Sequence, residues 1–181
     1  MRGMSETVET LPILLVPDPV LRARARPVTA DDMARMRALA PRMFATMYQA
    51  PGIGLAAPQV GVGLRCAVVD LLADNVSEPI TLINPEVIAR SEELATREEG
   101  CLSLPGQYAE VTRPARVTVR HLDLAGVRRQ IEAEGLLAAC LQHEIDHLDG
   151  VLFVDHLSAL KRNMILRRLA KELRQKRTEA M

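Results

Sequence analysis

Residues 142–150 read Gln-His-Glu-Ile-Asp-His-Leu-Asp-Gly, which places His143 and His147 four positions apart around Glu144. Positions four apart lie on the same face of an α-helix. The residues just before this segment are mostly apolar, so that face is expected to point into the interior. The sequence therefore predicts a buried helix over residues 136–148, around which the rest of the chain must pack.

This His-Glu-x-x-His spacing also carries chemistry. Two imidazoles on one helical face can bind one metal ion, while the carboxylate of Glu144 reaches ion-bound water without binding the ion. A dication lowers the pKa of that water to about 7, and the carboxylate can then accept its proton. The alternative is a solvated helix face with two ordinary histidines. Two of only four histidines fall at this spacing, which favours a metal site.

A metal site of this kind needs a third protein ligand. Known downstream patterns of zinc proteases fit poorly, because Phe153 stands where a histidine is needed and Glu172 lies in a basic stretch. The third ligand is therefore expected upstream. Cys101, in a turn marked by glycine and proline, is a candidate because a thiolate binds zinc or ferrous iron. A single cysteine is also often a small buried apolar residue.

Residues 52–59 read Gly-Ile-Gly-Leu-Ala-Ala-Pro-Gln, which superficially fits a dinucleotide-binding loop. That loop requires a strand before it and a helix after it. Here a helical stretch precedes the segment and Pro58 breaks the helix that should come after it, so we exclude nucleotide binding. The small residues either let an extended substrate approach the backbone closely or form a tight turn packed by alanines.

The rest of the chain reads as helices towards the two ends and strands in the middle. Residues 30–49 predict a helix with Thr29 as N-cap, and its methionines recur at a spacing typical of core packing rather than of a cofactor site. Alternating residues predict strands at 64–70, 80–84, 87–89, 116–120 and 128–133 and around Val111. We expect an α+β fold, with mostly antiparallel sheets around a central helix that carries the His-Glu-x-x-His motif, and with N-terminal and C-terminal helices.

Length and composition limit the number of domains, the cellular compartment and the classes of partner that we expect. A chain of 181 residues predicts a single catalytic domain over 1–181, with 1–10 as a flexible polar tail. Three widely spaced cysteines argue against a disulfide framework, and neither a signal peptide nor a membrane span is recognised, so we expect a cytoplasmic protein. Zero net charge and 2% aromatic residues give no indication of DNA binding or of a base-stacking surface.

Three segments, taken in order, resemble peptide deformylase. They are Gly-x-Gly-x-Ala-Ala-x-Gln at 52–59, Glu-Gly-Cys-Leu-Ser at 99–103 and Gln-His-Glu-x-Asp-His-Leu-x-Gly at 142–150. The resemblance begins near Pro17 and continues through Asp155 into a final helix. It implies a hydrolase of protein biosynthesis that removes the N-formyl group from formyl-methionine at the start of new polypeptides.

The resemblance also implies roles for individual residues. Cys101, His143 and His147 would bind the metal, which is Fe²⁺ in the family, with Zn²⁺, Ni²⁺ or Co²⁺ able to substitute. Metal-bound hydroxide would attack the formyl carbon, with Glu144 as general base and acid. Gln59 and the backbone N–H of Leu102 would donate hydrogen bonds to the developing oxyanion. These residues would form the catalytic and metal-binding set.

Substrate contacts are expected from the glycine loop, the cysteine segment and the metal helix. The candidates are Gly52, Ile53, Gly54, Glu99, Gly100, Tyr108, Leu136, Ala139 and Cys140. Tyr108 departs from the family, since many bacterial relatives carry an arginine there. Glu99 and Arg113 are also candidates for a pair that orients a ligand.

The C-terminal helix, predicted over 158–177, is strongly basic. Between residues 161 and 177 it carries eight basic residues and one acid, Glu172. Its apolar stripe (Met164, Ile165, Leu166, Leu169 and Leu173) would dock the helix. The basic face is either simply solvated or contacts ribosomal RNA near emerging chains.

Two rival functions remain open for the whole chain. One is a general zinc endopeptidase, and the other is a non-catalytic RNA-binding protein with a structural metal. We expect a monomer.

Overall fold

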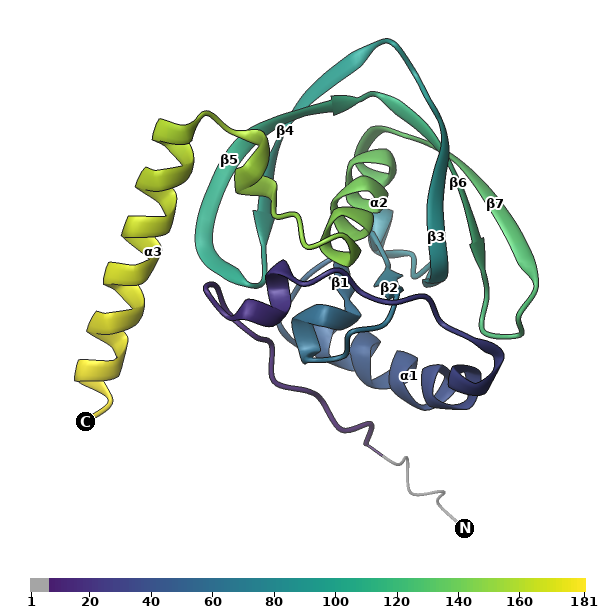
Figure 1. The fold of residues 1–181 in the computed structure, drawn as a ribbon, viewed down its shortest axis with the longest axis horizontal. Coiled ribbons are helices and arrows are strands. Elements are labelled where there is room, and N and C mark those ends of the chain that lie inside the picture. Colours follow the sequence, from purple (N-terminus) through teal and green to yellow (C-terminus); the bar gives the residue numbers. More distant parts are fainter. Residues whose placement is uncertain (1–6) are drawn as a thin grey trace.

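The computed structural model describes residues 7–181, and positions 1–6 of the predicted tail lie outside this range. Within it the chain forms α1 (Met33–Gln49), α2 (Gly135–Leu148) and α3 (Ala159–Glu179), joined by strands and short 3₁₀ turns (Figure 1). No helix in the described range is both long enough and apolar enough to cross a membrane.

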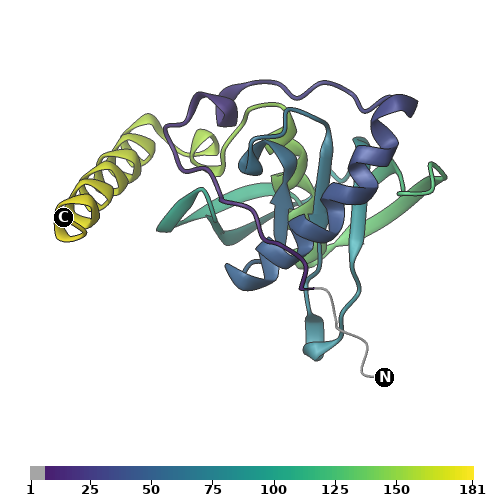
Figure 2. The same cartoon turned by 90° about the horizontal axis from the view of Figure 1, so that it is seen from below.

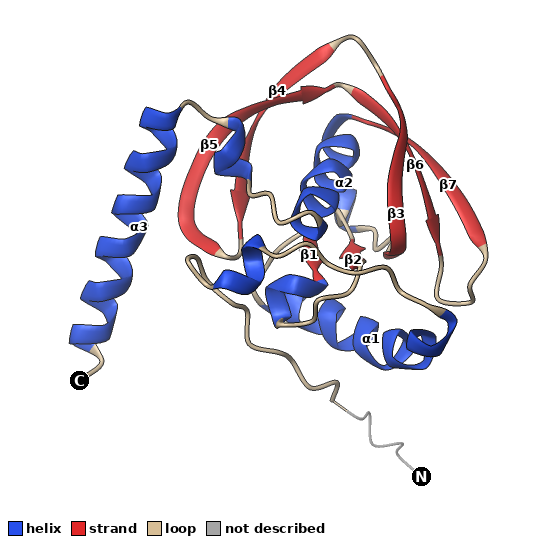
Figure 3. Cartoon of the chain, viewed as in Figure 1, coloured by secondary structure: helices blue, strands red, loops and turns tan. Residues whose placement is uncertain are grey.

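The strands form two antiparallel sheets. The larger sheet has the order β1-β2-β3-β6-β7 and contains β1 (Gly54–Ala56), β2 (Cys66–Val69), β3 (Ile80–Arg90), β6 (Arg116–Leu122) and β7 (Arg128–Glu134). The smaller one is a hairpin of β4 (Leu94–Cys101) and β5 (Leu104–Pro114). The strands arch over α2, which lies at the centre of the molecule (Figure 3). The predicted α+β class, with mostly antiparallel sheets around a central helix that carries the His-Glu-x-x-His motif, is confirmed.

Helix α2 is held on the larger sheet by its apolar face. Ala138, Leu141, Ile145 and Leu148 are buried and pack in one cluster with apolar residues of the sheet. Gly150, just after the helix, has a positive φ of 75°, and a Cβ there would collide with the carbonyl oxygen of Arg22. A glycine is therefore required where the chain leaves α2.

Helix α1 packs against strands β1 and β2 from the face opposite to α2. Its fully buried methionines, Met36, Met43 and Met47, pack against Leu55 and Val68, as the spacing predicted. The helix begins later than predicted, at Met33, because residues 30–32 form a 3₁₀ turn.

Thr29 stands at the N-cap position of this 3₁₀ turn, as predicted. Its N–H and its hydroxyl donate hydrogen bonds to the carboxylate of Asp32 at 2.8 and 3.0 Å. The contact that fixes the start of the turn is therefore made by Asp32, and the side chain of Thr29 accepts no capping hydrogen bond.

Helix α3 packs along one side of the hairpin and projects from the body of the protein (Figure 2). Ile165 and Leu169 are buried against Phe153 and Val111, and Leu166 and Leu173 pack beside them. Met164 was predicted to join this stripe, but it is 52% exposed. It lies one position away from the buried row and so faces solvent.

Three strand predictions need correction. Residues 80–84 and 87–89 belong to one strand, β3, which continues past Pro85 by means of a register shift and a left-handed Asn84 (φ 49°). Strands β1 and β4 were not predicted. The predicted strand over 64–70 is shorter and spans Cys66–Val69.

Candidate metal centre and active site

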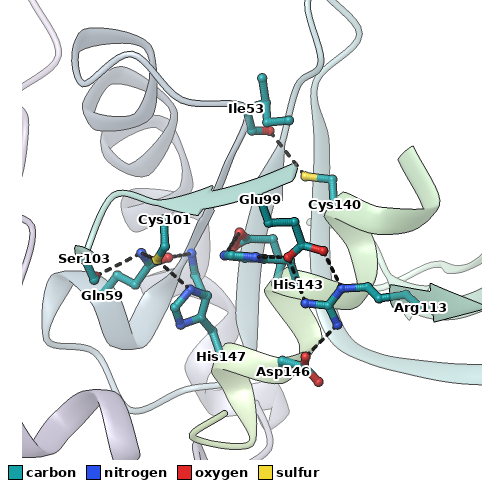
Figure 4. Close-up of polar contacts among 12 residues, drawn as sticks. Ile53, Gln59, Glu99, Cys101, Ser103, Arg113, Cys140, His143, Asp146 and His147 are labelled. Atoms are coloured by element: carbon teal, nitrogen blue, oxygen red, sulfur yellow. Dashed lines mark hydrogen bonds and ion pairs between the residues drawn. The ribbon is translucent and has the colours of Figure 1, made fainter. Parts of the chain in front are cut away.

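The three predicted metal ligands meet in the structure, although they come from two separate elements. Cys101 is the last residue of β4, whereas His143 and His147 project from α2 towards it (Figure 4). One donor atom from each lies within 4.8 Å of the others, and Cys101 Sγ is 3.3 Å from His147 Nε2. Ligand atoms around a tetrahedral ion lie about 3.3–3.6 Å apart, given metal–ligand bonds of about 2.0–2.3 Å. The set therefore needs little adjustment to hold one ion.

The electrostatics of the two histidines also fit a cation. Burial lowers the pKa of His147 well below its usual value, and the nearby charges of His143 and Arg113 lower it further, so its imidazole is uncharged, as a metal-binding imidazole must be. Burial would also lower the pKa of His143, but hydrogen bonds with Cys101 and Glu99 raise it well above its usual value. The contacts that attract a proton to His143 would equally favour a metal ion.

Glu144 is buried beside the three candidate ligands. It is 3% exposed, and burial raises the pKa of its carboxyl group to about 7, against the opposing charge of His143. Its Oε1 lies 3.9 Å from His143 Nε2, and its buried Oε2 has no hydrogen-bond partner among the described residues. A carboxyl group with such a pKa can both accept and return a proton near neutral pH.

Gln59 is fixed at the other side of Cys101. The backbone N–H of Ala56 donates to Gln59 Oε1 at 2.9 Å, which orients the amide group. Gln59 Nε2 then points at Ser103 Oγ, 3.1 Å away, and at Cys101 Sγ, 3.6 Å away. The backbone N–H of Leu102 donates to no other backbone group within residues 7–181. Both expected oxyanion donors thus lie beside the cysteine.

Ser103 was not singled out from the sequence, although it is fully buried and contacts Gln59. Its place in the Glu-Gly-Cys-Leu-Ser segment was the available signal. Sequence spacing alone does not show that this hydroxyl reaches back to a glutamine 44 positions earlier.

The candidate orienting pair, Glu99 and Arg113, is present as a buried ion pair. Arg113 donates through Nε to Glu99 Oε2 at 2.7 Å and through Nη2 to Glu99 Oε1 at 2.9 Å. Glu99 Oε1 also lies 3.0 Å from His143 Nδ1. Burial opposes ionisation, but the hydrogen bonds from Arg113 and His143 lower the pKa of Glu99 to about 2. The carboxylate therefore holds Nδ1–H of His143 and leaves Nε2 as the ligand atom.

All of the predicted substrate-contact residues line one cavity of about 700 Å³. The candidate ligands Cys101 and His143 line the same cavity. Cys140 Sγ lies 3.8 Å from the carbonyl oxygen of Ile53, which closes its inner wall. Leu136 and Tyr108 are 46% and 63% exposed and stand at its mouth. Glu99 was predicted to touch substrate, but its carboxylate is engaged by Arg113 and His143. Ile13 and Arg97 also line this cavity and were not predicted.

Tyr108 occupies its place because of a glycine opposite. Gly100 pairs with Tyr108 across the hairpin, and a Cβ on Gly100 would come within 2.5 Å of the tyrosine ring. The ring therefore occupies the space that a side chain at position 100 would fill, at the edge of the cavity.

Comparisons with known proteins agree with this geometry. Residues 10–163 match the family model described as polypeptide deformylase. A peptide deformylase of Rhizobium meliloti is 52% identical over 171 residues, which cover 94% of this chain and 98% of that protein. One from Mesorhizobium japonicum is 53% identical over 161 residues, which cover 88% of this chain and 91% of that protein.

Solved structures give the same result. The crystal structure of a peptide deformylase from Legionella pneumophila matches with a TM-score of 0.85 and 49% identity, over 92% of this chain and 97% of that one. The enzyme from Ehrlichia chaffeensis, solved in complex with actinonin, matches with a TM-score of 0.86 and 39% identity, over 91% and 98% of the two chains.

Proposed function

Because the chain belongs to the polypeptide deformylase family, hydrolases that remove N-formyl groups from nascent peptides, we propose that it acts on formyl-methionine in a metal-dependent reaction. The observation that carries this proposal is the cluster of Cys101, His143 and His147 beside a cavity that Cys101, His143 and the buried Glu144 line. A cytoplasmic location, where new chains begin, is part of the same proposal.

Cys101, His143 and His147 would hold one divalent ion. A thiolate with two imidazoles suits ferrous iron, zinc, nickel or cobalt, and we propose Fe²⁺ as the native ion on the family resemblance. When bound, such an ion polarises a carbonyl oxygen and lowers the pKa of water. Three protein donors leave a position open for substrate, whereas a purely structural zinc site is closed by four.

The chain's own groups supply the remaining steps. Glu144 would take a proton from the attacking water and deliver it to the amine that leaves. Gln59 Nε2 and the N–H of Leu102 would donate hydrogen bonds to the oxygen on which charge develops, a contribution of about 10²–10³ in rate for one such donor.

Selectivity for methionine would come from the apolar wall of the cavity. Ile53, Leu136, Ala139 and Cys140 line it beside His143 and would receive the methionine side chain. Strand β1 lies at the edge of the larger sheet and runs into this cavity, so an extended peptide can pair with its free edge.

Formate release from a formyl-methionyl peptide tests the proposal directly. The expected result is steady release that a chelator abolishes and added divalent metal restores. An unformylated peptide of the same sequence serves as the control. Internal cleavage of that control would favour an endopeptidase, and an enzyme that keeps full activity after its metal is removed would contradict the proposed chemistry.

We propose further that α3 brings the enzyme to the ribosome. Most of its eight basic residues are exposed, and none of them forms an ion pair within residues 7–181. The buried stripe of α3 faces the hairpin, so the basic face is turned to solvent. Such a surface suits electrostatic contact with RNA phosphates.

Neutralising charge without removing the helix gives the sharper test. Changing Arg167, Arg168, Lys171 and Arg174 to glutamine should weaken co-sedimentation with ribosomes at low salt and leave peptide deformylation unchanged. The matched control changes four exposed arginines elsewhere: Arg24, Arg35, Arg90 and Arg128. Equal loss of binding in both variants would show a general charge effect and refute a role for α3.

A further inference from the structure

A chain of charged hydrogen bonds runs from the ligand His143 to the protein surface. Glu99 lies next to His143, Arg113 next to Glu99, and Asp146 next to Arg113 (Figure 4). The chain ends at His156, whose Nε2 is 2.7 Å from Asp146 Oδ2 and 3.4 Å from Arg113 Nη1. These residues come from β4, β5, α2 and the 3₁₀ turn η5 (Phe153–His156), so the chain joins four elements.

Arg113 is the centre of this chain. Its side chain is 7% exposed. Its guanidinium donates hydrogen bonds through Nε and Nη2 to Glu99, and through Nη1 to Asp146 Oδ2 at 2.8 Å. A buried cation must keep its partners, and the rigid planar fork fixes where those partners lie. The position of Asp146 therefore constrains Arg113, and Arg113 constrains Glu99.

Two oxygens transmit the constraint because each accepts two hydrogen bonds. Asp146 Oδ2 accepts from Arg113 and from His156 Nε2, since the 2.7 Å contact of Nε2 with this carboxylate is much shorter than its 3.4 Å contact with the donor Arg113 Nη1 and favours a proton on Nε2. Glu99 Oε1 accepts from Arg113 and from His143 Nδ1. Without His156, the Asp146 side chain, which is 25% exposed, loses one of the two donors that hold its carboxylate in place.

We propose that His156 is a positioning residue for the metal centre, acting through Asp146, Arg113 and Glu99 on the orientation of His143. The inference rests on the proposed metal-dependent function and extends it to a residue that touches neither ion nor substrate. His156 closes η5, which leads through Ser158 into α3. The junction between body and C-terminal helix is thereby linked to a metal ligand.

The test follows the metal rather than turnover. Zn²⁺-loaded wild type and His156→Ala are mixed with excess chelator, and the rate of Zn²⁺ loss is measured. Direct orienting partners of metal ligands change affinity by about 10–100-fold, so a group further out is expected to speed metal loss by about 3–10-fold. The Co²⁺-loaded variant should also show shifted visible absorption bands.

Three further variants distinguish an effect on the orientation of His143 from a general loss of stability around η5. His156→Gln keeps an N–H donor for Asp146 and should restore metal retention and the Co²⁺ bands towards wild type. Asp155→Ala removes the acceptor for Leu152 N and the partner of Arg22, so it should lower the melting temperature without changing metal loss. Asp146→Asn combined with His156→Ala should be less than additive, because both act on one chain.

The proposal is overturned if His156→Ala retains Zn²⁺ and the Co²⁺ bands like wild type. It is equally overturned if Asp155→Ala accelerates metal loss to the same extent, or if His156→Gln fails to restore retention. Formate release by the wild type is measured in parallel. Its absence in a protein that binds Zn²⁺ would refute the proposed function and leave the metal-retention comparison intact.

Discussion

The carboxyl group of Glu144 is suited to the proposed role, in which it must both accept and release a proton. Burial raises its pKa to about 7, and one of its oxygens has no hydrogen-bond partner within the described residues. His147 turns its Nε2 towards Cys101 Sγ, and His143 Nε2 lies nearer Oε1 of Glu144, at 3.9 Å, so neither imidazole hydrogen-bonds to Oε2. Under the proposed mechanism, Oε2 is the oxygen that can exchange a proton with water.

Glu144→Gln should keep the metal and lose turnover. The amide has the same shape but cannot accept and return a proton, so formate release is expected to fall by about 10²–10⁴-fold. Metal content by elemental analysis should remain at one ion per chain. A variant that keeps near-normal turnover would contradict the assignment of Glu144 as base and acid.

Gly54 brings β1 unusually close to this carboxyl group. A Cβ at Gly54 would lie 2.8 Å from Glu144 Oε1 and 3.0 Å from Cys140 Sγ. Gly54→Ala should therefore displace Glu144 and lower kcat/KM by about tenfold or more, a loss of about 1.4 kcal/mol in transition-state stabilisation. Gly63→Ala is the control, because no heavy atom lies within 4 Å of a Cβ there. Equal kinetics for the two variants would refute this interpretation.

At the residue scale, the sequence predicted the groups that follow a local spacing. His143, Glu144 and His147 share one helix face, and Cys101 stood out once the downstream ligand patterns failed. Ser103, Asp146 and His156 were missed. Their roles depend on contacts with residues from other segments, which no local spacing records.

At the element scale, α3 is attached by a short row of apolar side chains. Leu169 is 2% exposed among Phe153, Leu104 and Val111, whereas Leu160, on the same helix, is 72% exposed. The docking of the helix therefore depends on its inner face, and its outer face is free for charge.

Leu169→Ala should destabilise the protein by about 2–4 kcal/mol, the usual cost of a cavity in a core. Activity below the unfolding transition should be nearly unchanged, since Leu169 does not line the substrate cavity. Urea unfolding followed by circular dichroism measures the effect. Leu160→Ala is the control and should stay within about 0.5 kcal/mol of wild type; a comparable loss there would contradict the assigned packing.

Helices and strands were predicted from the sequence where the spacing of apolar residues matches the face that is buried in the structure. The methionine row of α1 and the apolar face of α2 follow a helical period because each faces a core on one side. Strand β4 was missed because its sequence, Leu-Ala-Thr-Arg-Glu-Glu-Gly-Cys, has three charged residues in a row and no alternating apolar pattern, and only one of its eight residues is buried. It forms because β5 pairs with it along its length, which is a tertiary rather than a local cause.

At the scale of the whole molecule, one buried carboxylate ties a loop to the body of the protein. Asp70 is fully buried and accepts hydrogen bonds from Tyr48, Ser77 and the backbone N–H groups of Leu72 and Glu78. Burial opposes ionisation, but these donors lower the pKa of Asp70 to about 2.

This shift predicts how global stability depends on pH. The unfolded-state pKa is about 3.9, so Asp70 contributes its full stabilisation, of the order of 2 kcal/mol, above about pH 5. The contribution is lost as pH falls from about 4 towards 2. The difference in unfolding free energy between wild type and Asp70→Asn should therefore shrink over that range.

Urea unfolding at several pH values measures this difference. Glu110→Gln, at an exposed position of β5, is the control and should differ little from wild type at each pH. A gap between wild type and Asp70→Asn that stays constant with pH would mean that the carboxylate is not the source of the stabilisation.

Sheet order is the part of the whole molecule that the sequence predicted least. The class of fold followed from strands flanked by helices, but the separation of β4 and β5 from the larger sheet did not. Strand β3 pairs with β6 and skips the hairpin between them, because the hairpin turns away to cover α2.

That separation has a mechanical consequence. Cys101 belongs to the hairpin, whereas His147, 46 positions later, belongs to the helix packed on the larger sheet. An ion held by both would act as a removable crosslink between the two sheets. A covalent crosslink closing a loop of this length would be worth about 4 kcal/mol in the chain-entropy model. Chelation should then speed amide hydrogen exchange across β4 and β5 more than across β6 and β7. The hairpin would lose its crosslink to α2, whereas the strand pairing of the larger sheet would be unchanged.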